Sequence, residues 1–161
     1  MIKMIRIDER LVHGQVALIW TRHLSVDRII VINDKVAANP TLTATLKMAA
    51  PDSVKCIVLG VEKGIQLLND PRTEPLKILV VINNAHDAKI ICQNVSNIPL
   101  LNVGNYGRAE GNLDIKEKVT DNLFLTDKDK EDFREIFKTG VATKYQIVPD
   151  QPITDMKEFI K

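Results

Sequence analysis

The sequence has few aromatic residues, little cysteine and almost no net charge. Aromatic residues make up 4% of the 161 positions, and 22 Lys and Arg are balanced by 21 Asp and Glu, for a formal charge of +1. Non-specific nucleic-acid binding needs a surplus of basic groups, and stacking of bases needs aromatic rings. We therefore expect no nucleic-acid partner.

The two cysteines, Cys56 and Cys92, each lie inside an apolar run and form no CxxC motif. This pattern favours small buried side chains over zinc ligands, although it leaves a disulfide open. The longest apolar runs, such as residues 78–82, are far shorter than the roughly 18 residues of a membrane span, and the N-terminus has no signal-peptide pattern. We expect one cytoplasmic domain over residues 1–161.

Short apolar runs alternate with helical patterns along the chain. The runs are mostly β-branched and do not alternate with polar residues, which is typical of strands buried on both faces of a parallel sheet. They cover residues 1–7, 28–32, 56–59, 78–82, 100–103, 123–125 and 146–148. Amphipathic spacing predicts helices over residues 15–24, 41–50, 61–69, 88–95 and 127–139. These patterns predict an α/β fold, an open, mostly parallel twisted sheet of about seven strands with helices on both faces.

Two further segments carry weaker signals. Residues 104–112 are rich in glycine and asparagine, which predicts a loop. Residues 153–160 are expected to form a last helix with an apolar strip. That strip could pack on this domain or on a second copy, as a homodimer.

The loop after the first predicted strand gathers charged residues between two apolar segments. It reads Arg-Ile-Asp-Glu-Arg-Leu-Val-His-Gly-Gln-Val over residues 6–16. In open α/β sheets, ligands bind beyond the carboxyl ends of the strands. His13 would stand directly before a helix whose free amides and dipole favour an anion, and Gly14 would let that anion approach the backbone. The loop is therefore the candidate site.

The side chains of this loop suit a phosphohistidine. A neutral imidazole of His13 is a nucleophile toward phosphorus. Arg10 can present a planar fork to phosphate oxygens, and with Gly14 and Gln15 it forms the predicted phosphate-binding set. Asp8 could either fix the imidazole tautomer or hold Arg10. Since no pair of histidines has metal-ligand spacing, we expect no metal and no cofactor.

The other two histidines, His23 and His86, can be explained by their places near the ends of predicted helices. His23 lies near the end of the first predicted helix, where the helix dipole favours a cation. His86 precedes another predicted helix, which Asp87 could cap.

The loop closely resembles the opening motif of the EIIB components of the mannose/fructose/sorbose family of the bacterial phosphoenolpyruvate-dependent sugar phosphotransferase system. That motif is approximately R-I-D-x-R-L-[IV]-H-G-Q-V, and this sequence meets every specified position. Other matches extend the resemblance over nearly the whole chain: Trp20, residues 28–34, Asn102-Val103-Gly104 and Val148-Pro149.

The resemblance implies a mostly parallel sheet and a phosphocarrier activity. His13 would accept a phosphoryl group from a phosphohistidine of EIIA and pass it to a sugar bound by the membrane components EIIC and EIID. The protein would thus be the EIIB component of a protein-Nπ-phosphohistidine–sugar phosphotransferase, associated peripherally with the permease. Arg10 and Asp8 fall on positions that support the phosphohistidine. The sequence departs from the N-V-G-G-M of many relatives at Asn105-Tyr106, and it adds Arg108. The sugar is not indicated.

The sequence leaves three alternative functions to consider. A receiver-like module would use Asp34 as phosphoacceptor, although the first strand lacks the acidic pair that binds Mg²⁺. A nucleotide-binding regulatory module would be expected to show GxGxxG or a P-loop motif, and neither is present. A phosphocysteine at Cys56 would need an accessible thiol, whereas Cys56 lies within a predicted strand.

Overall fold

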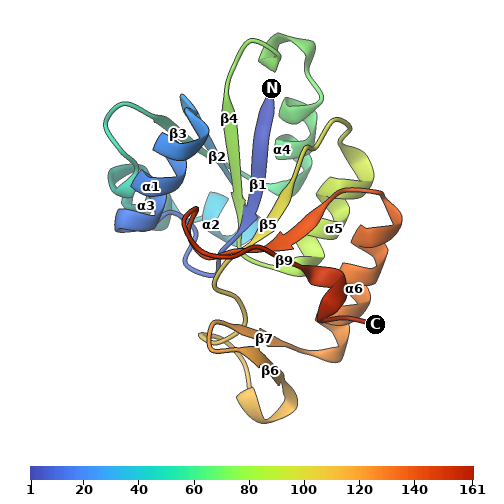
Figure 1. The fold of residues 1–161 in the computed structure, drawn as a ribbon. Helices are drawn as coiled ribbons and strands as arrows, with labels where there is room; N and C mark the ends of the chain where they lie inside the picture. The colour runs from blue at the N-terminus through green and yellow to red at the C-terminus, as the bar shows by residue number, and fades with distance from the viewer.

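The computed structural model describes all 161 residues except the side chain of Gln15. A central sheet contains β1 (Ile2–Ile7), β2 (Arg28–Ile32), β3 (Lys55–Leu59), β4 (Ile78–Ile82), β5 (Leu101–Val103), β8 (Thr143–Tyr145) and β9 (Thr154–Asp155). The strand order is β3-β2-β4-β1-β5-β8-β9 (Figure 1). All neighbouring strands are parallel except β8 and β9, which are antiparallel. The predicted fold class is confirmed.

The sheet separates two hydrophobic cores, and β4 shows why its strands are apolar throughout. Leu79 and Val81 point into one core, whereas Ile78, Val80 and Ile82 point into the other. Because successive side chains of a strand face opposite sides of the sheet, a strand covered on both faces needs a continuous apolar run. The central strands therefore lack the alternation of a half-exposed strand.

The helices cover the two faces of the sheet (Figure 1). One face carries α1 (Gly14–Leu24), α2 (Asp34–Ala37) and α3 (Pro40–Ala49); the other carries α4 (Val61–Leu68), α5 (Ala85–Asn94) and α6 (Asp127–Lys138). The chain leaves β1 toward the first face and leaves the adjacent β4 toward the second. The carboxyl ends of β1 and β4 therefore border a topological switch point, where open α/β sheets bind their ligands.

The five predicted helices are present, whereas two of the predicted strands need correction. Residues 123–125 form β7 (Leu123–Leu125), but β7 pairs with β6 (Glu117–Thr120) in a separate antiparallel hairpin. The strand predicted over residues 146–148 is wrong, because β8 ends at Tyr145. The Gln146 side chain donates to the carbonyl oxygens of Pro149 and Gln151, which folds the following segment into a turn.

The helix predicted over residues 153–160 is also wrong. Residues 154–155 form the edge strand β9, and a 3₁₀ turn, η3 (Met156–Glu158), follows with Asp155 as its cap. Met156 and Ile160 are buried in the core of this domain, while Ile153 is exposed. The apolar strip thus packs on its own domain. Two other 3₁₀ turns are η1 (Pro71–Thr73) and η2 (Leu113–Ile115), and residues 104–112 form the predicted loop.

No helix in the described part of the chain combines the length and apolar character needed to cross a membrane.

Candidate functional site

We call the loop between β1 and α1, residues 8–13, the active loop. It turns sharply because Leu11 has a φ of 58° and its backbone N–H donates to the carbonyl oxygen of Asp8 at 2.9 Å. A left-handed conformation costs a non-glycine residue roughly 1–2 kcal/mol. The Leu11 side chain is buried in a core, which offsets that cost. The turn brings residue 13 back to residue 8.

His13 and Asp8 meet at the base of this turn. His13 Nε2 lies 3.1 Å from Asp8 Oδ2, within ion-pair distance but without the alignment of a linear hydrogen bond. Asp8 is fully buried, whereas 19% of the His13 side chain is exposed. His13 is the N-cap of α1 but its side chain makes no capping hydrogen bond. The ring is therefore anchored on one nitrogen and still reachable from outside.

Asp8 also contacts both neighbouring arginines. Its Oδ2 accepts from Arg6 Nη2 at 3.1 Å, and its Oδ1 accepts from the backbone N–H of Arg10 at 3.1 Å. The two roles that the sequence left open for Asp8 thus coexist: it faces the imidazole of His13 and holds Arg10 through the backbone. The Arg10 side chain is exposed.

Arg6 forms the buried support of the site. Its guanidinium donates to Asn102 Oδ1 and to the carbonyl oxygen of Gln146, and it lies over the Trp20 ring at 5.2 Å. A Cβ on Gly104 would stand 2.3 Å from Arg6 Nη2, so this position requires glycine. The sequence prediction of site residues missed Arg6 and Asn102. The signal that could have identified Arg6 is its position as a charged residue inside an apolar predicted strand.

The charges of this cluster determine its protonation. Burial raises the pKa of Asp8, but the His13 ring and the Arg6 guanidinium outweigh burial, so the pKa of this carboxyl lies below its usual value. Burial lowers the pKa of Arg6, and the nearby Asp8 carboxylate partly offsets this effect. Asp8 is therefore a carboxylate at neutral pH, facing the imidazole.

The remaining predicted phosphate-binding residues begin α1. Gly14 is exposed, has a φ of 39° and is the first residue of the helix, and a Cβ there would meet no atom within 4 Å. Gln15 is the second residue of α1, and its side chain lies outside the described part of the structure. The first turn of α1 thus begins directly after His13.

The other candidate residues lie away from this cluster. His23 is exposed in the last turn of α1, as expected. His86 is exposed inside α5 rather than before it, and the cap of α5 is Asn84 instead of Asp87. Asp34 Oδ1 accepts from the backbone N–H of Val61 at 2.8 Å, which joins the start of α2 to the start of α4.

Cys56 and Cys92 are free and buried, and they do not form a disulfide. Burial raises the pKa of the Cys56 thiol to about 11 and that of the Cys92 thiol to about 12. A phosphoacceptor cysteine needs to be a thiolate near neutral pH. These values oppose a phosphocysteine at Cys56.

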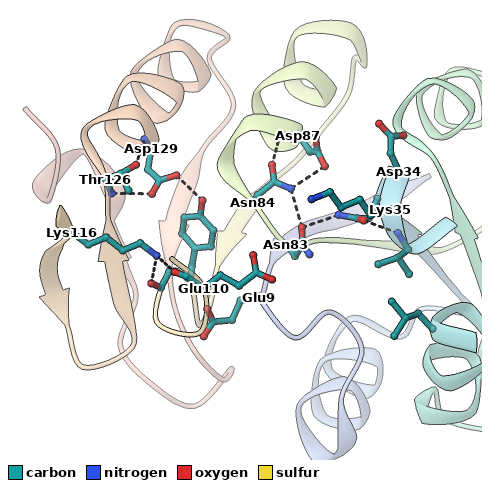
Figure 2. Close-up of a pocket in the computed structure, with 15 residues that line it drawn as sticks. Glu9, Asp34, Lys35, Asn83, Asn84, Asp87, Glu110, Lys116, Thr126 and Asp129 are labelled. Carbon is teal, nitrogen blue, oxygen red and sulfur yellow. Dashed lines mark hydrogen bonds between the residues drawn. The ribbon is translucent and has the colours of Figure 1, made fainter. Parts of the chain in front are cut away.

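A cavity of about 640 Å³ lies at the same edge of the sheet (Figure 2). Glu9 of the active loop lines it, but His13 and Arg10 do not. Its charged side chains are five carboxylates and two ammonium groups, from Glu9, Asp34, Asp87, Glu110, Asp129, Lys35 and Lys116. This excess of carboxylates disfavours the phosphates of a nucleotide. Among the described residues, no three His, Cys, Asp or Glu side chains are grouped to hold a metal ion.

The comparisons with known proteins agree with one another. Residues 2–161 match the family model described as "PTS system sorbose subfamily IIB component". The chain is 40% identical to a probable phosphotransferase enzyme IIB component of Streptococcus pyogenes serotype M6, over 99% of both chains. It is 32% identical to the mannose-specific EIIAB component of the phosphotransferase system of Escherichia coli K12, over 96% of this chain and 47% of that protein.

Among solved structures, the IIB domain of the sorbose permease of Klebsiella pneumoniae superposes with a TM-score of 0.90 at 29% identity. The match covers 98% of this chain and 94% of that one. The fold, the sequence of the active loop and the full-length family match lead to one conclusion: this chain belongs to the sorbose subfamily of IIB components of the bacterial sugar phosphotransferase system.

Proposed function

We propose that the chain is a phosphocarrier whose acceptor is His13. It takes a phosphoryl group from a phosphohistidine of an EIIA protein and transfers it to a sugar that the membrane components EIIC and EIID import. The observation behind this proposal is the arrangement of a partly exposed imidazole against a buried carboxylate at the start of a helix. The name of the E. coli relative, an EIIAB component, supports EIIA as the donor.

The geometry favours Nδ1 of His13 as the reacting atom. Nε2 is enclosed and faces Asp8, so a proton on Nε2 would be stabilised by the carboxylate and the lone pair would reside on Nδ1. In an in-line transfer, the new N–P bond forms at Nδ1 while the N–P bond of the donor histidine breaks. Asp8 then stabilises the positive charge that the phosphorylated ring gains.

Arg10 and the start of α1 would stabilise the transferring phosphoryl group. The exposed guanidinium of Arg10 can pair with two phosphoryl oxygens, and the free backbone amides of Gly14 and Gln15 lie at the positive end of the helix dipole. Asp8 is used for orientation, so these groups would supply the charge stabilisation that Mg²⁺ supplies in kinases. Residues 1–161 would act as one EIIB domain, held at the membrane permease by its partners.

The test is transfer of labelled phosphate from phosphoenolpyruvate through EIIA to this protein. Wild-type protein should take up one acid-labile, base-stable label, which peptide mass spectrometry places on His13. His13→Ala should take up none, while His23→Ala serves as the matched control and should be labelled like wild type. Full labelling of His13→Ala, or an acid-stable adduct, would refute the proposal.

A further inference from the structure

Glu9 connects the active loop to a second loop. Its backbone N–H donates to the carbonyl oxygen of Asn105 at 2.8 Å, and its carboxylate accepts from the backbone N–H of Ala109 at 3.0 Å. Both partners belong to residues 105–116, which lie between β5 and β6 and which we call the docking segment. The residue next to Asp8 in the chain thus bonds to a segment about 100 positions away.

The docking segment has further hydrogen bonds, one to α6 and others within the segment itself. The Tyr106 hydroxyl donates to Asp129 Oδ1 at 2.6 Å, at the start of α6. Lys116 Nζ donates to the carbonyl oxygens of Gly107, at 2.6 Å, and of Glu110, so it ties the two ends of the loop together (Figure 2). The hydrogen bond from the Ala109 N–H to the Glu9 carboxylate is the side-chain contact that joins this loop to the active loop.

The contact between Asp8 and His13 does not depend on Glu9. The Asp8 backbone N–H donates to the carbonyl oxygen of Ile82 at 2.9 Å, and its carboxylate is held by Arg6. Loss of the Glu9 carboxylate would therefore release the segment around Ala109, while the backbone bond from Glu9 to Asn105 and the bond from Tyr106 to Asp129 would still hold its start. The reacting groups would stay in place.

The docking segment exposes side chains that suit a protein partner. Leu113 is 44% and Ile115 is 69% exposed, and Arg108 is exposed on the same segment. The active loop and the docking segment border the same cavity, because Glu9, Gly107, Glu110 and Lys116 all line it. Exposed apolar side chains beside the loop that carries His13 suit contact with a protein that docks there, and the phosphoryl donor is the partner that must approach His13.

We propose that Glu9 is a positioning residue that clamps the docking segment to the active loop, so that the phosphoryl donor meets one preassembled surface. This inference rests on the proposed function. Without the clamp, part of the population would hold the stretch around Ala109 in another position, and apparent affinity falls in proportion to the competent fraction. The predicted effect is therefore on the KM for phospho-EIIA and not on kcat.

The experiment measures labelling of His13 at varied concentrations of phospho-EIIA. Glu9→Ala should raise the KM about 3- to 10-fold, as expected for one lost hydrogen bond, with kcat within about twofold. Glu9→Gln keeps an acceptor oxygen and should remain close to wild type. Glu131→Ala, which removes an exposed carboxylate from α6, is the matched control and should also behave like wild type.

Amide hydrogen exchange reports the clamp directly. The Ala109 amide should exchange faster in Glu9→Ala than in wild type or Glu9→Gln, with a melting temperature lowered by no more than about 2–4 °C. An unchanged KM in Glu9→Ala, an equal defect in Glu9→Gln, or a fall in kcat alone would overturn the inference. A wild-type protein that takes no label would overturn the proposed function and the docking role. The exchange rate of the Ala109 amide would still show whether Glu9 holds the docking segment.

Discussion

Asp8 keeps a negative charge in the interior because donors surround it. Arg6 contributes its guanidinium, Arg10 its backbone amide, and His13 a ring nitrogen at 3.1 Å. Removing water from an ion costs several kcal/mol, so a buried carboxylate persists only where such partners replace the solvent. The stability of the site therefore depends on Arg6, a residue that we do not expect to touch the phosphoryl group.

Replacement of Arg6 by Leu should destabilise the fold more than the same change at Arg10. Breaking one partner of a buried ion pair costs roughly 3–5 kcal/mol, whereas substitution of an exposed side chain usually changes stability by no more than about 0.5 kcal/mol. Urea unfolding of Arg6→Leu and Arg10→Leu measures the difference. Equal unfolding free energies would contradict the supporting role of Arg6.

The sequence was informative for residues whose partners are close in the chain and less so for the others. Asp8 and His13 lie five positions apart, and the contact between them that the loop sequence suggested is present. Arg6 acquires its role from Asn102 and Gln146, which lie 96 and 140 positions away. Only the assembled sheet brings these three residues together, so the local pattern around Arg6 could not predict its contacts.

At the scale of elements, Asp132 joins α5 to α6. Its side chain is 2% exposed, and Oδ1 lies 3.0 Å from Lys89 Nζ on α5 and 2.9 Å from Lys128 Nζ on its own helix. Hydrogen bonds to charged groups contribute about 1.5–3 kcal/mol each. The two helices are thus held by an ion-pair cluster as well as by their apolar faces.

Asp132→Asn should lower the unfolding free energy by roughly 1.5–3 kcal/mol at pH 7. Burial raises the pKa of Asp132, but Lys128 and Lys89 outweigh burial and leave it below the usual value. The unfolded chain therefore takes up the proton first as the pH falls. The difference between wild type and variant should be complete above about pH 4 and should shrink below it.

Urea unfolding at pH 7 and pH 3 measures this prediction. Glu131→Gln, the exposed neighbour of Asp132 on α6, is the control and should show little difference at either pH. A difference between wild type and Asp132→Asn that grows toward pH 3 would show that the sign of the pKa shift is wrong.

Elements that depend on local signals were predicted well. The capping box between Thr126 and Asp129 begins α6 at Asp127, the residue expected from the sequence. In contrast, β9 exists because Asp155 and Thr154 pair with Lys144 and Tyr145. A two-residue strand has no periodicity of its own, so the apolar spacing of the last segment was mistaken for a helix.

At the scale of the whole molecule, each core contains one cysteine. Cys56 packs in the core that contains α1 and α3, and Cys92 in the core that contains α5 and α6. Both thiols should resist iodoacetamide at neutral pH in the folded protein, because each is buried and protonated, and both should react in urea. Intact-mass spectrometry counts the added groups. Rapid modification of one thiol without urea would contradict the burial of that residue.

The two edge strands of the sheet differ in length: β3 has five residues and β9 has two. The edge formed by β9 has only two residues, so it presents almost no row of free backbone amides and carbonyls. An extended segment from another molecule could find little there to pair with, and short edge strands of this kind protect natural proteins from aggregation. Lengthening β9 would therefore create a hazard that has nothing to do with phosphoryl transfer.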